Sequence, residues 1–300
     1  MENNPCGLLN LDKPTGVTSR AVVDRVARPL RGVKVGHAGT LDPLASGVLV
    51  VCVGAATRLI EYVQRMPKTY RTVVRLGARS DTLDADGRVT VAECPQVPTE
   101  GEVRAALAGQ VGTVAQRPPA FSARKVQGRR AYDLARAGQA VDLAPRPVTV
   151  DRIDLLGYAW PRLELEIACG GGTYIRSIAR DVGEALGCGG LVEVLARTRI
   201  GPFARAEALD PRVLSAETIP GLLRPAVEAV ADLPRLGLSA EQVEAVARGQ
   251  ALDWRRPGAG AIPEGEVALL GPDGALVAVA ECVAPARRVL PRRVLISAAP

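Results

Sequence analysis

The sequence predicts an α+β fold with a mixed, largely antiparallel sheet core, a basic arm inserted into that core, and a small C-terminal domain rich in β-strands. Three observations carry this prediction. Apolar strand-like runs alternate with amphipathic helical segments over most of the chain. Prolines bracket residues 117–147, and within them 117–130 hold five Lys or Arg and no acid. After about residue 233, short strands with Gly and Pro turns replace the earlier pattern.

The size of the chain allows two unequal domains. With 300 residues of which 47% are hydrophobic, it can bury a substantial core. We assign residues 1–230 to the main domain, including the insertion at 117–147. Residues 231–300 are assigned to the small C-terminal domain.

The N-terminal elements begin with a short strand at 7–14 and a helix. Either Thr18 or Ser19 caps this helix, because a hydroxyl can accept a hydrogen bond from a free N–H group of the first turn. The apolar face of the helix consists of residues at helical spacing: Val22, Val23, Val26 and Leu30. A Gly-rich loop then leads to a strand at 48–54 and a helix near 56–65.

The middle elements follow from alternation, turns and caps. Residues 68–77 form a strand, and 84–91 a hairpin turn that leads into its partner. Thr99 and Glu102 have the spacing of a capping box, which opens a helix ending near residue 109. Two strands and a helix after a glycine triplet are expected beyond the basic arm, at 148–158, 162–169 and 173–187.

The C-terminal domain is predicted from short strands around tight turns. In 267–280, a Gly-Pro-Asp-Gly turn separates two apolar stretches. The domain ends with a basic group in which no acid intervenes: Arg287, Arg288, Arg292 and Arg293.

Charge and cysteine content exclude several classes of protein. The net charge of +6 fits a polyanionic partner without requiring one. The six cysteines include no C-x-x-C pair and the chain has one histidine, so zinc ligation is not expected and the cysteines read as reduced core thiols. We see neither a secretory leader nor an apolar run of about 18 residues, and expect a cytoplasmic protein without a membrane partner.

Common nucleotide-binding and hydrolase motifs do not occur in the sequence. It contains no dinucleotide fingerprint, no P-loop and no G-x-S-x-G nucleophile elbow. Residues 81–87 (DTLDADG) weakly resemble a calcium loop but lack its acid spacing and terminal Glu. We interpret this run as a solvated hairpin turn.

Asp42 stands in the Gly-rich loop 36-GHAGTLDPLASG-47, directly before an apolar strand. Taken alone, an Asp before Pro is typical of a turn. If it reacts, it acts as a base or nucleophile, because an ordinary aspartate is ionised at neutral pH. Glycosidases generally need two carboxylates, and this loop holds one. A single carboxylate favours chemistry in which a glycosidic bond is broken and remade without water.

Four other residues suggest a function only when they are considered together. Tyr70, Tyr174, Arg176 and His37 each have an ordinary structural explanation when taken singly. Together with Asp42 they offer a carboxylate, an arginine that keeps it anionic, and two rings that can sandwich a flat base. With the basic arm, this set suits an enzyme that acts on a flipped-out base in RNA.

Five ordered motifs over about residues 5–205 resemble the bacterial tRNA pseudouridine-55 synthases, the TruB family. They are 8-LLNLDKPTGVTS-19, 36-GHAGTLDPLASGVLVV-51, 68-KTYRTVVRLG-77 with 79-RSDTLDADG-87, 121-FSARKVQGRRAYDLARAG-138 and 173-TYIRSIARDVG-183. The resemblance implies a pseudouridine synthase core, a PUA-type C-terminal domain that binds RNA, and no metal or organic cofactor.

The resemblance also implies a role for each site residue. Asp42 is the catalytic aspartate that attacks either the ribose C1′ or the uracil C6, Tyr70 stacks on the base and assists proton transfer, and Arg176 pairs with the carboxylate. Tyr174 and Leu195 line the pocket, and His37 lies near the flipped nucleotide. The residues expected to grip RNA are those of the insertion: Arg124, Lys125, Arg129 and Arg130.

The expected partner is the T-arm of tRNA, whose uridine 55 is isomerised by base flipping. The basic insertion favours a stand-alone monomer that uses no guide RNA. One departure from the family is Gly171, because many relatives have Ser-Lys before Gly-Thr-Tyr-Ile-Arg whereas this chain reads 170-GGGTYIR-176. Two alternatives stay open: a non-catalytic tRNA-folding chaperone that uses the same RNA-binding surface, and a small-molecule glycosidase.

Overall fold

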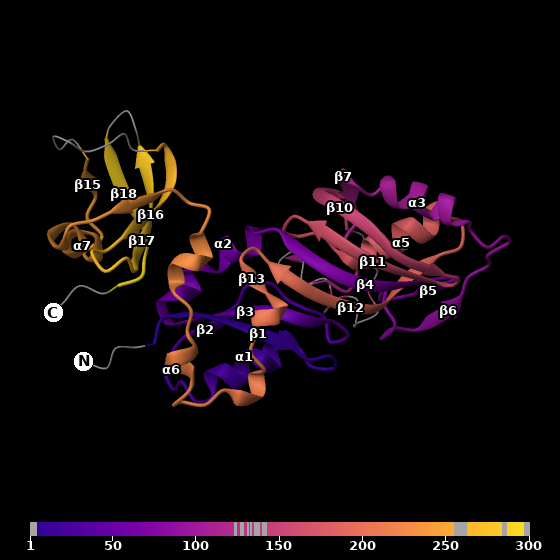
Figure 1. Cartoon of the computed structure of the whole chain (residues 1–300), viewed down its shortest axis with the longest axis horizontal. Helices are drawn as coiled ribbons and strands as arrows, with labels where there is room; N and C mark the ends of the chain where they lie inside the picture. Colours follow the sequence, from indigo (N-terminus) through magenta and orange to yellow (C-terminus); the bar gives the residue numbers. More distant parts are fainter. Residues whose placement is uncertain are drawn as a thin grey trace.

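The structure is a computed structural model that describes residues 5–122, 143–254, 263–283 and 287–296. Between 123 and 142 it describes residues 125, 126, 129, 130, 132, 134 and 139. Figure 1 shows a large twisted sheet with helices around it, and a separate small sheet near the C-terminus. The predicted α+β architecture with a mixed, mainly antiparallel core sheet is confirmed.

The large sheet has the strand order β1-β3-β12-β4-β11-β10-β7, with β2 beside β3 and β13 beside β12. Every pairing in it is antiparallel except the short contact between β12 and β3. The strands are β1 (Gly7–Lys13), β2 (Val35–His37), β3 (Ser46–Val53), β4 (Lys68–Leu76), β7 (Gly112–Gln116), β10 (Arg146–Ala159), β11 (Arg162–Cys169), β12 (Gly190–Ile200) and β13 (Phe203–Ala204).

Strand β3 is apolar without alternation because both of its faces are buried. Leu49 and Val51 belong to the cluster that packs on helix α1 (Ser19–Ala27). Val50 and Cys52 belong to the cluster on the opposite face, which contains the short helix α2 (Ile60–Arg65). The Asp42 loop therefore leads into the most deeply buried strand of the sheet.

The predicted helices are present, with some differences at their starts. Thr18 is the N-cap of α1, and the helix expected near 56–65 begins as a 3₁₀ helix, η1 (Gly54–Leu59), before α2. The Thr99 capping box opens α3 (Glu100–Ala108) as predicted. Helix α5 (Ile175–Ala185) packs on one face of the large sheet (Figure 1).

The hairpin expected at 84–91 is real, but its partner was predicted wrongly. Strand β6 (Val89–Val91) pairs with β5 (Ala78–Ser80) in a sheet of their own. Strand β4 already has β11 and β12 on its two edges, so no edge is left for β6. The chain leaves the large sheet at Gly77, whose φ of +71° marks the bend between β4 and β5.

The C-terminal sheet has the order β14-β16-β17-β18-β15 and carries helix α7 (Ala240–Ala247). Its strands are β14 (Arg235–Gly237), β15 (Leu252–Asp253), β16 (Gly265–Leu270), β17 (Leu276–Val283) and β18 (Arg288–Val294). The connection from β13 consists of short turns of helix: η2 (Arg205–Glu207), η3 (Pro211–Val213), α6 (Ile219–Leu222) and η4 (Ala226–Val230). The division at 230/231 into two functional domains stays a prediction.

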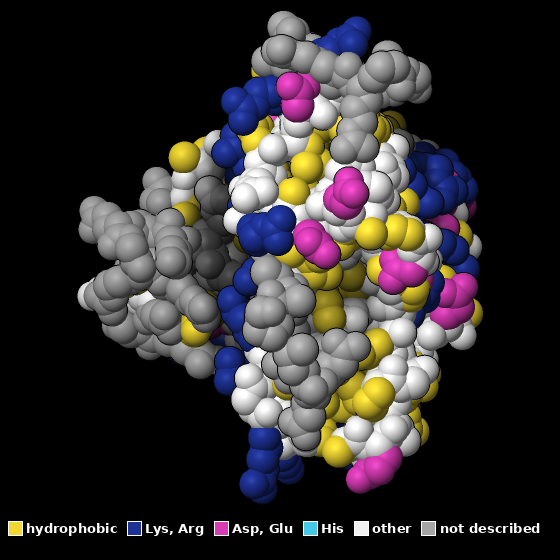
Figure 2. All heavy atoms as spheres, turned by 90° about the vertical axis from the view of Figure 1, so that its left-hand side faces the viewer, with side chains coloured by type: hydrophobic (Ala, Val, Ile, Leu, Met, Phe, Trp, Pro, Cys, Tyr) yellow, Lys and Arg dark blue, Asp and Glu magenta, His cyan; other side chains and the backbone are white. Residues whose placement is uncertain are grey.

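The C-terminal sheet packs against α2. Tyr62 donates a hydrogen bond of 2.6 Å to Glu266, and Arg293 pairs with Glu61 at 2.9 Å. Arg292 pairs with Glu281 on the neighbouring strand. Figure 2 views the molecule from this end and shows Lys and Arg side chains along the borders of the face, with acidic side chains scattered between them.

The insertion is described only in part. Its backbone forms a two-stranded hairpin of β8 (Lys125–Val126) and β9 (Arg129–Arg130). Arg124 and the side chains of Lys125, Arg129 and Arg130 lie outside the described residues, so their RNA-gripping role stays a prediction.

Two further expectations concern the burial of the cysteines and the absence of a membrane-spanning helix. Of the six cysteines, all free, four are buried: Cys52, Cys169, Cys188 and Cys282. This confirms core thiols for those four, whereas Cys6 is exposed and Cys94 half-buried. Within the described ranges, no helix is long and apolar enough to cross a membrane.

Candidate active site

Asp42 is both a turn residue and a cavity residue. Its backbone carbonyl accepts a hydrogen bond of 3.1 Å from the N–H of Ala45, which closes a tight turn between β2 and β3. Its carboxylate points to the start of α5, where Oδ2 lies 3.0 Å from Nη2 of Arg176. The two interpretations that the sequence left open are therefore compatible.

Arg176 contacts polar groups from several separate segments of the chain. Its side chain is only 6% exposed, and it bridges Asp42 and Asp84, with Nη1 at 3.1 Å from Oδ2 of Asp84. The guanidinium also donates to the carbonyls of Thr82 at 2.7 Å and Phe121 at 2.8 Å. A planar donor fork with this many partners has little rotational freedom. Arg176 is thus fixed in place before any substrate binds.

Asp84 is the main site residue that sequence reasoning missed. We expected residues 81–87 to form a solvated turn, but Asp84 is 4% exposed. Its carboxylate accepts hydrogen bonds from the hydroxyl of Thr82 at 2.6 Å and the N–H of Asp86 at 3.2 Å. The turn interpretation holds for Asp81, which accepts from the N–H of Arg88 at 2.8 Å. Composition alone does not tell which acid of this run turns inward.

A cavity of about 290 Å³ opens beside the Asp42 carboxylate. This is at the small end of the range for ligand pockets, about 300–1,000 Å³. Tyr70 from β4 and Leu195 from β12 line it across two paired strands, and Tyr174 lines it from the start of α5. The structure thus brings Asp42, Tyr70, Tyr174, Arg176 and Leu195 to one cavity, as expected.

Tyr70 and Tyr174 differ in their surroundings. Tyr70 is 7% exposed, and burial raises the pKa of its phenol, with the nearby Arg197 guanidinium opposing that shift. Tyr174 is held by its backbone, because its N–H donates to the side-chain oxygen of Gln116 at 2.8 Å. The guanidinium of Arg146 lies 5.7 Å from the centre of the Tyr174 ring, within the range of a cation–π contact.

The pKa of Asp42 is raised, chiefly by burial of the carboxyl group. Arg176 lowers the pKa and the Asp84 charge raises it, in that order of importance. The Arg176 guanidinium therefore favours the anionic form of this carboxyl group, although burial has the larger effect on its pKa. The side chain of Asp42 nevertheless remains 38% exposed, so the protein packs around the carboxylate without closing it off from the cavity.

Three buried cations surround the site and were also missed: Lys13, Lys68 and Arg197. Burial lowers the pKa of Lys13 and of Lys68 to about 8 in each case. Lys68 donates to the carbonyls of Gln64 and Met66 at 2.8 and 2.7 Å. Because alternate strand residues share a face, its spacing from Tyr70 could have predicted this position.

His37 and Gly171 are two positions from the sequence analysis that contribute no side chain to the described cavity. His37 lies on β2, where it pairs with Val51, and does not belong to the described lining of the cavity. A Cβ built on Gly171 would lie 2.6 Å from the carbonyl oxygen of Gln64. The backbone therefore leaves no room here for the basic side chain that many relatives carry.

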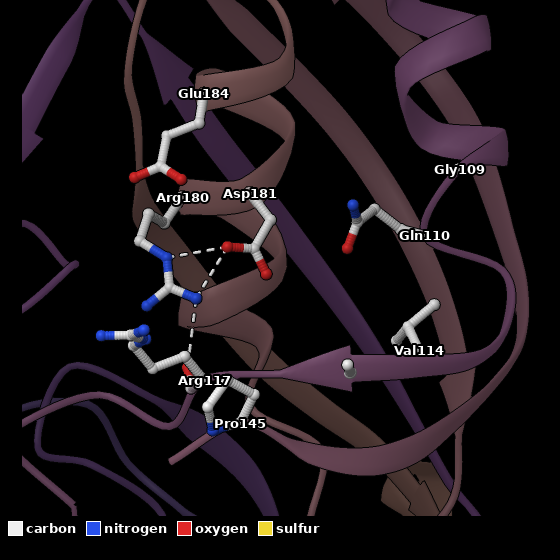
Figure 3. A pocket seen from close by; sticks show the side chains of 9 residues that line it. Gly109, Gln110, Val114, Arg117, Pro145, Arg180, Asp181 and Glu184 are labelled. Carbon is white, nitrogen blue, oxygen red and sulfur yellow. Dashed lines mark hydrogen bonds and ion pairs between the residues drawn. The ribbon is translucent and has the colours of Figure 1, made fainter. Parts of the chain in front are cut away.

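A second and larger groove lies along the outer part of α5. It measures about 690 Å³ and is lined by Gln110, Arg117, Arg180, Asp181 and Glu184 among others (Figure 3). Arg180 there pairs with its own neighbour Asp181 at 2.7 Å. It shares no lining residue with the Asp42 cavity, and its charges are balanced.

Comparisons with known proteins agree with this site. Residues 27–175 match the model of the TruB family pseudouridylate synthase N-terminal domain, and 176–219 that of the tRNA pseudouridylate synthase B C-terminal domain. The chain is 46% identical over 240 residues to tRNA pseudouridine synthase B of Cereibacter sphaeroides strain ATCC 17023, covering 78% of this chain and 79% of that one. It is 42% identical to the enzyme of the same name from Syntrophobacter fumaroxidans, covering 93% and 94%.

Solved structures extend the similarity to nearly the whole chain. An H/ACA RNP bound to a substrate RNA containing 2′-deoxyuridine contains a chain that matches with a TM-score of 0.73 at 26% identity, over 97% of this chain and 85% of that one. A chain of the archaeal box H/ACA sRNP Nop10-Cbf5 complex matches with the same TM-score at 27% identity, over 98% and 88%. With the sequence matches, these findings show that this chain belongs to the TruB family of pseudouridylate synthases.

Proposed function

We propose that this chain isomerises uridine to pseudouridine at position 55 in the T-loop of tRNA, with Asp42 as the nucleophile. The names of the relatives support tRNA pseudouridylation as the reaction. The observation that carries the residue assignment is the 3.0 Å pair between Asp42 and Arg176 at the mouth of a cavity lined by Tyr70. The T-arm and position 55 are inferred from the motif resemblance.

The reaction begins with extrusion of the uridine from its loop, which requires a few kcal/mol of unstacking. Stacking of the base on Tyr70 offsets about 1–3 kcal/mol of this cost. Asp42 then attacks either C1′ of the ribose or C6 of the uracil. Arg176 holds the carboxylate in its attacking position while the negative charge of the carboxylate passes to the uracil.

Isomerisation moves the base without net addition of atoms. The bond between C1′ and N1 breaks, the uracil turns within the cavity, and a bond between C1′ and C5 forms. The bond to Asp42 breaks in turn, which returns the carboxylate to its free, anionic form. The proton on C5 leaves and N1 gains one. Burial raises the pKa of the Tyr70 phenol, so the phenol stays protonated at neutral pH. Its first role is therefore to support the base. It can assist proton transfer as a relay, which gives up its own proton while it accepts another.

Substrate binding is assigned to charged groups outside the cavity. Phosphates of the T-arm are bound by the insertion residues Arg124, Lys125, Arg129 and Arg130. On duplex DNA, each neutralised phosphate steepens the fall of the logarithm of the binding constant with the logarithm of the salt concentration by about 0.9, and we expect a similar value here. His37 contacts the RNA near the flipped nucleotide from outside the cavity wall. The PUA-like C-terminal domain adds a second RNA contact, and the chain works as a monomer without guide RNA or membrane partner.

The test is incubation of the purified chain with an unmodified tRNA transcript, followed by mapping of pseudouridine. We expect product at the T-loop uridine with the native chain and none with Asp42→Asn, although both bind the transcript equally well. Binding without product in the native chain would favour a tRNA-folding chaperone. Replacing Arg124, Lys125, Arg129 and Arg130 together by Ala should weaken binding by orders of magnitude.

A further inference from the structure

We infer that Ser19 is a positioning residue for the Asp42 carboxylate, a role that rests on the proposed function of Asp42. Thr18 and Ser19 are adjacent hydroxyl residues, and either could cap α1. The structure separates their tasks. The hydroxyl of Thr18 accepts from the N–H of Ala21 at 3.0 Å and caps the helix, whereas Ser19 turns into the protein and is 2% exposed.

The hydroxyl of Ser19 binds both polar groups of one backbone residue. It accepts a hydrogen bond of 2.8 Å from the N–H of Leu41 and donates one of 2.9 Å to the carbonyl of Leu41. Leu41 directly precedes Asp42 and is itself 4% exposed. Because both bonds are buried, loss of the hydroxyl leaves two backbone groups without these partners.

A second anchor holds the other side of Asp42. The carbonyl of Pro43 accepts a hydrogen bond of 2.8 Å from the N–H of Gly16. The residues before and after Asp42 are therefore both tied to the short segment 16–19. Two fixed flanking residues set the direction of the Asp42 side chain toward Arg176, which lies 3.0 Å away.

Loss of one anchor should affect the chemical step more than RNA binding. A displacement of about 1 Å at a reacting group can lower a rate about 100-fold. Ser19→Ala is therefore expected to lower the single-turnover rate about 10- to 100-fold. Its affinity for tRNA should stay at the native value, because the hydroxyl of Ser19 is buried against Leu41 and faces no ligand.

The adjacent Thr18→Ala variant is the matched control. It removes the helix cap, which should lower the melting temperature by about 2–4 °C. It leaves both hydrogen bonds to Leu41 in place. Measured well below both melting temperatures, Thr18→Ala should retain the native rate, whereas Ser19→Ala should not.

A third variant covers the case in which Ser19→Ala does not fold. Ser19→Cys keeps the shape of the side chain but has a weaker donor and acceptor. We expect an intermediate rate with unchanged tRNA affinity. A Ser19 variant whose rate equals that of Thr18→Ala would overturn the inference.

The readouts separate this inference from the proposed function. If the native chain forms no pseudouridine, the proposed function fails before any variant is compared. If the native chain forms product and the Ser19 and Thr18 variants react equally fast, only the role of Ser19 fails.

Discussion

Helix α5 carries two arginines one turn apart, and they belong to two different pockets. Arg176 joins carboxylates from two distant segments, Asp42 and Asp84, beside a cavity of about 290 Å³. Arg180 joins the adjacent Asp181 beside a groove of about 690 Å³. The larger pocket has a local ion pair with balanced charges, and the smaller one gathers polar groups from across the chain. Convergence of distant residues, rather than volume, marks the reactive site.

The largest expected effect comes from removing the reacting group itself. Asp42→Asn keeps the shape of the side chain but removes its negative charge. We expect the rate of pseudouridine formation to fall by roughly 10⁴- to 10⁶-fold, as when a nucleophile is lost in other enzymes. Single-turnover assays with mapped product check this. Asp181→Asn in the groove is the control, and an equal loss there would contradict the comparison.

Exchanging each arginine for lysine tests the difference between the two ion pairs. Arg176→Lys keeps a positive charge but loses the planar fork that bridges two carboxylates. We expect about a 100- to 1,000-fold lower rate, of the size seen when a preorganised donor is removed. Arg180→Lys should stay within about twofold of the native rate, because Arg180 does not line the Asp42 cavity. Comparable losses in both variants would remove the distinction.

Replacing the second carboxylate should change the pH dependence of the rate. The Asp84 charge raises the pKa of Asp42, so Asp84→Asn lowers that pKa. Because Asp42 must be ionised to attack, the acid limb of the rate profile should move to lower pH. The maximal rate should fall about 10- to 100-fold, because Arg176 loses one of its fixed partners. An acid limb that stays in place or moves to higher pH would count against the electrostatic account.

The smallest expected effect concerns stability. Burial lowers the pKa of Lys68 to about 8 from 10.5, so between these values the folded chain releases a proton that the unfolded chain keeps. Lys68 therefore makes the free energy of unfolding rise with pH in this window. In Lys68→Met that contribution is absent. Between pH 8 and 10.5, the free energy of unfolding of the native chain should therefore rise by about 1–3 kcal/mol more than that of the variant. Urea titrations measure this, and the variant Lys34→Met, which changes an exposed lysine and retains Lys68, should keep the native rise with pH.

Much of the fold could be predicted from the sequence because local patterns determined it. The unbroken apolar run 48–54 is a strand buried on both faces, and Thr99 with Glu102 caps a helix as expected. The partner of the hairpin at 84–91 was wrong because strand pairing depends on which edges other strands occupy. That information is not local.

The site was predictable where residues reach the cavity from recognisable motifs. Asp42, Tyr70, Tyr174, Arg176 and Leu195 all line it, as the family resemblance implied. Asp84 was missed because its partner, Arg176, lies 92 residues away along the chain. A turn rich in acids gives no local sign that one of them pairs with a distant arginine.

The packing on helix α2 has a consequence for dissecting this chain. Tyr62 and Met66 share one apolar cluster with Ala268, Leu276 and Val279 of the C-terminal sheet. The same six-residue helix supplies Gln64 to the cavity wall. Deleting residues after 230 would therefore strip the outer side of that wall and expose its apolar side chains to water. A shortened chain would test a damaged catalytic unit, so the contribution of the C-terminal sheet to RNA binding is better measured by point substitutions on its surface.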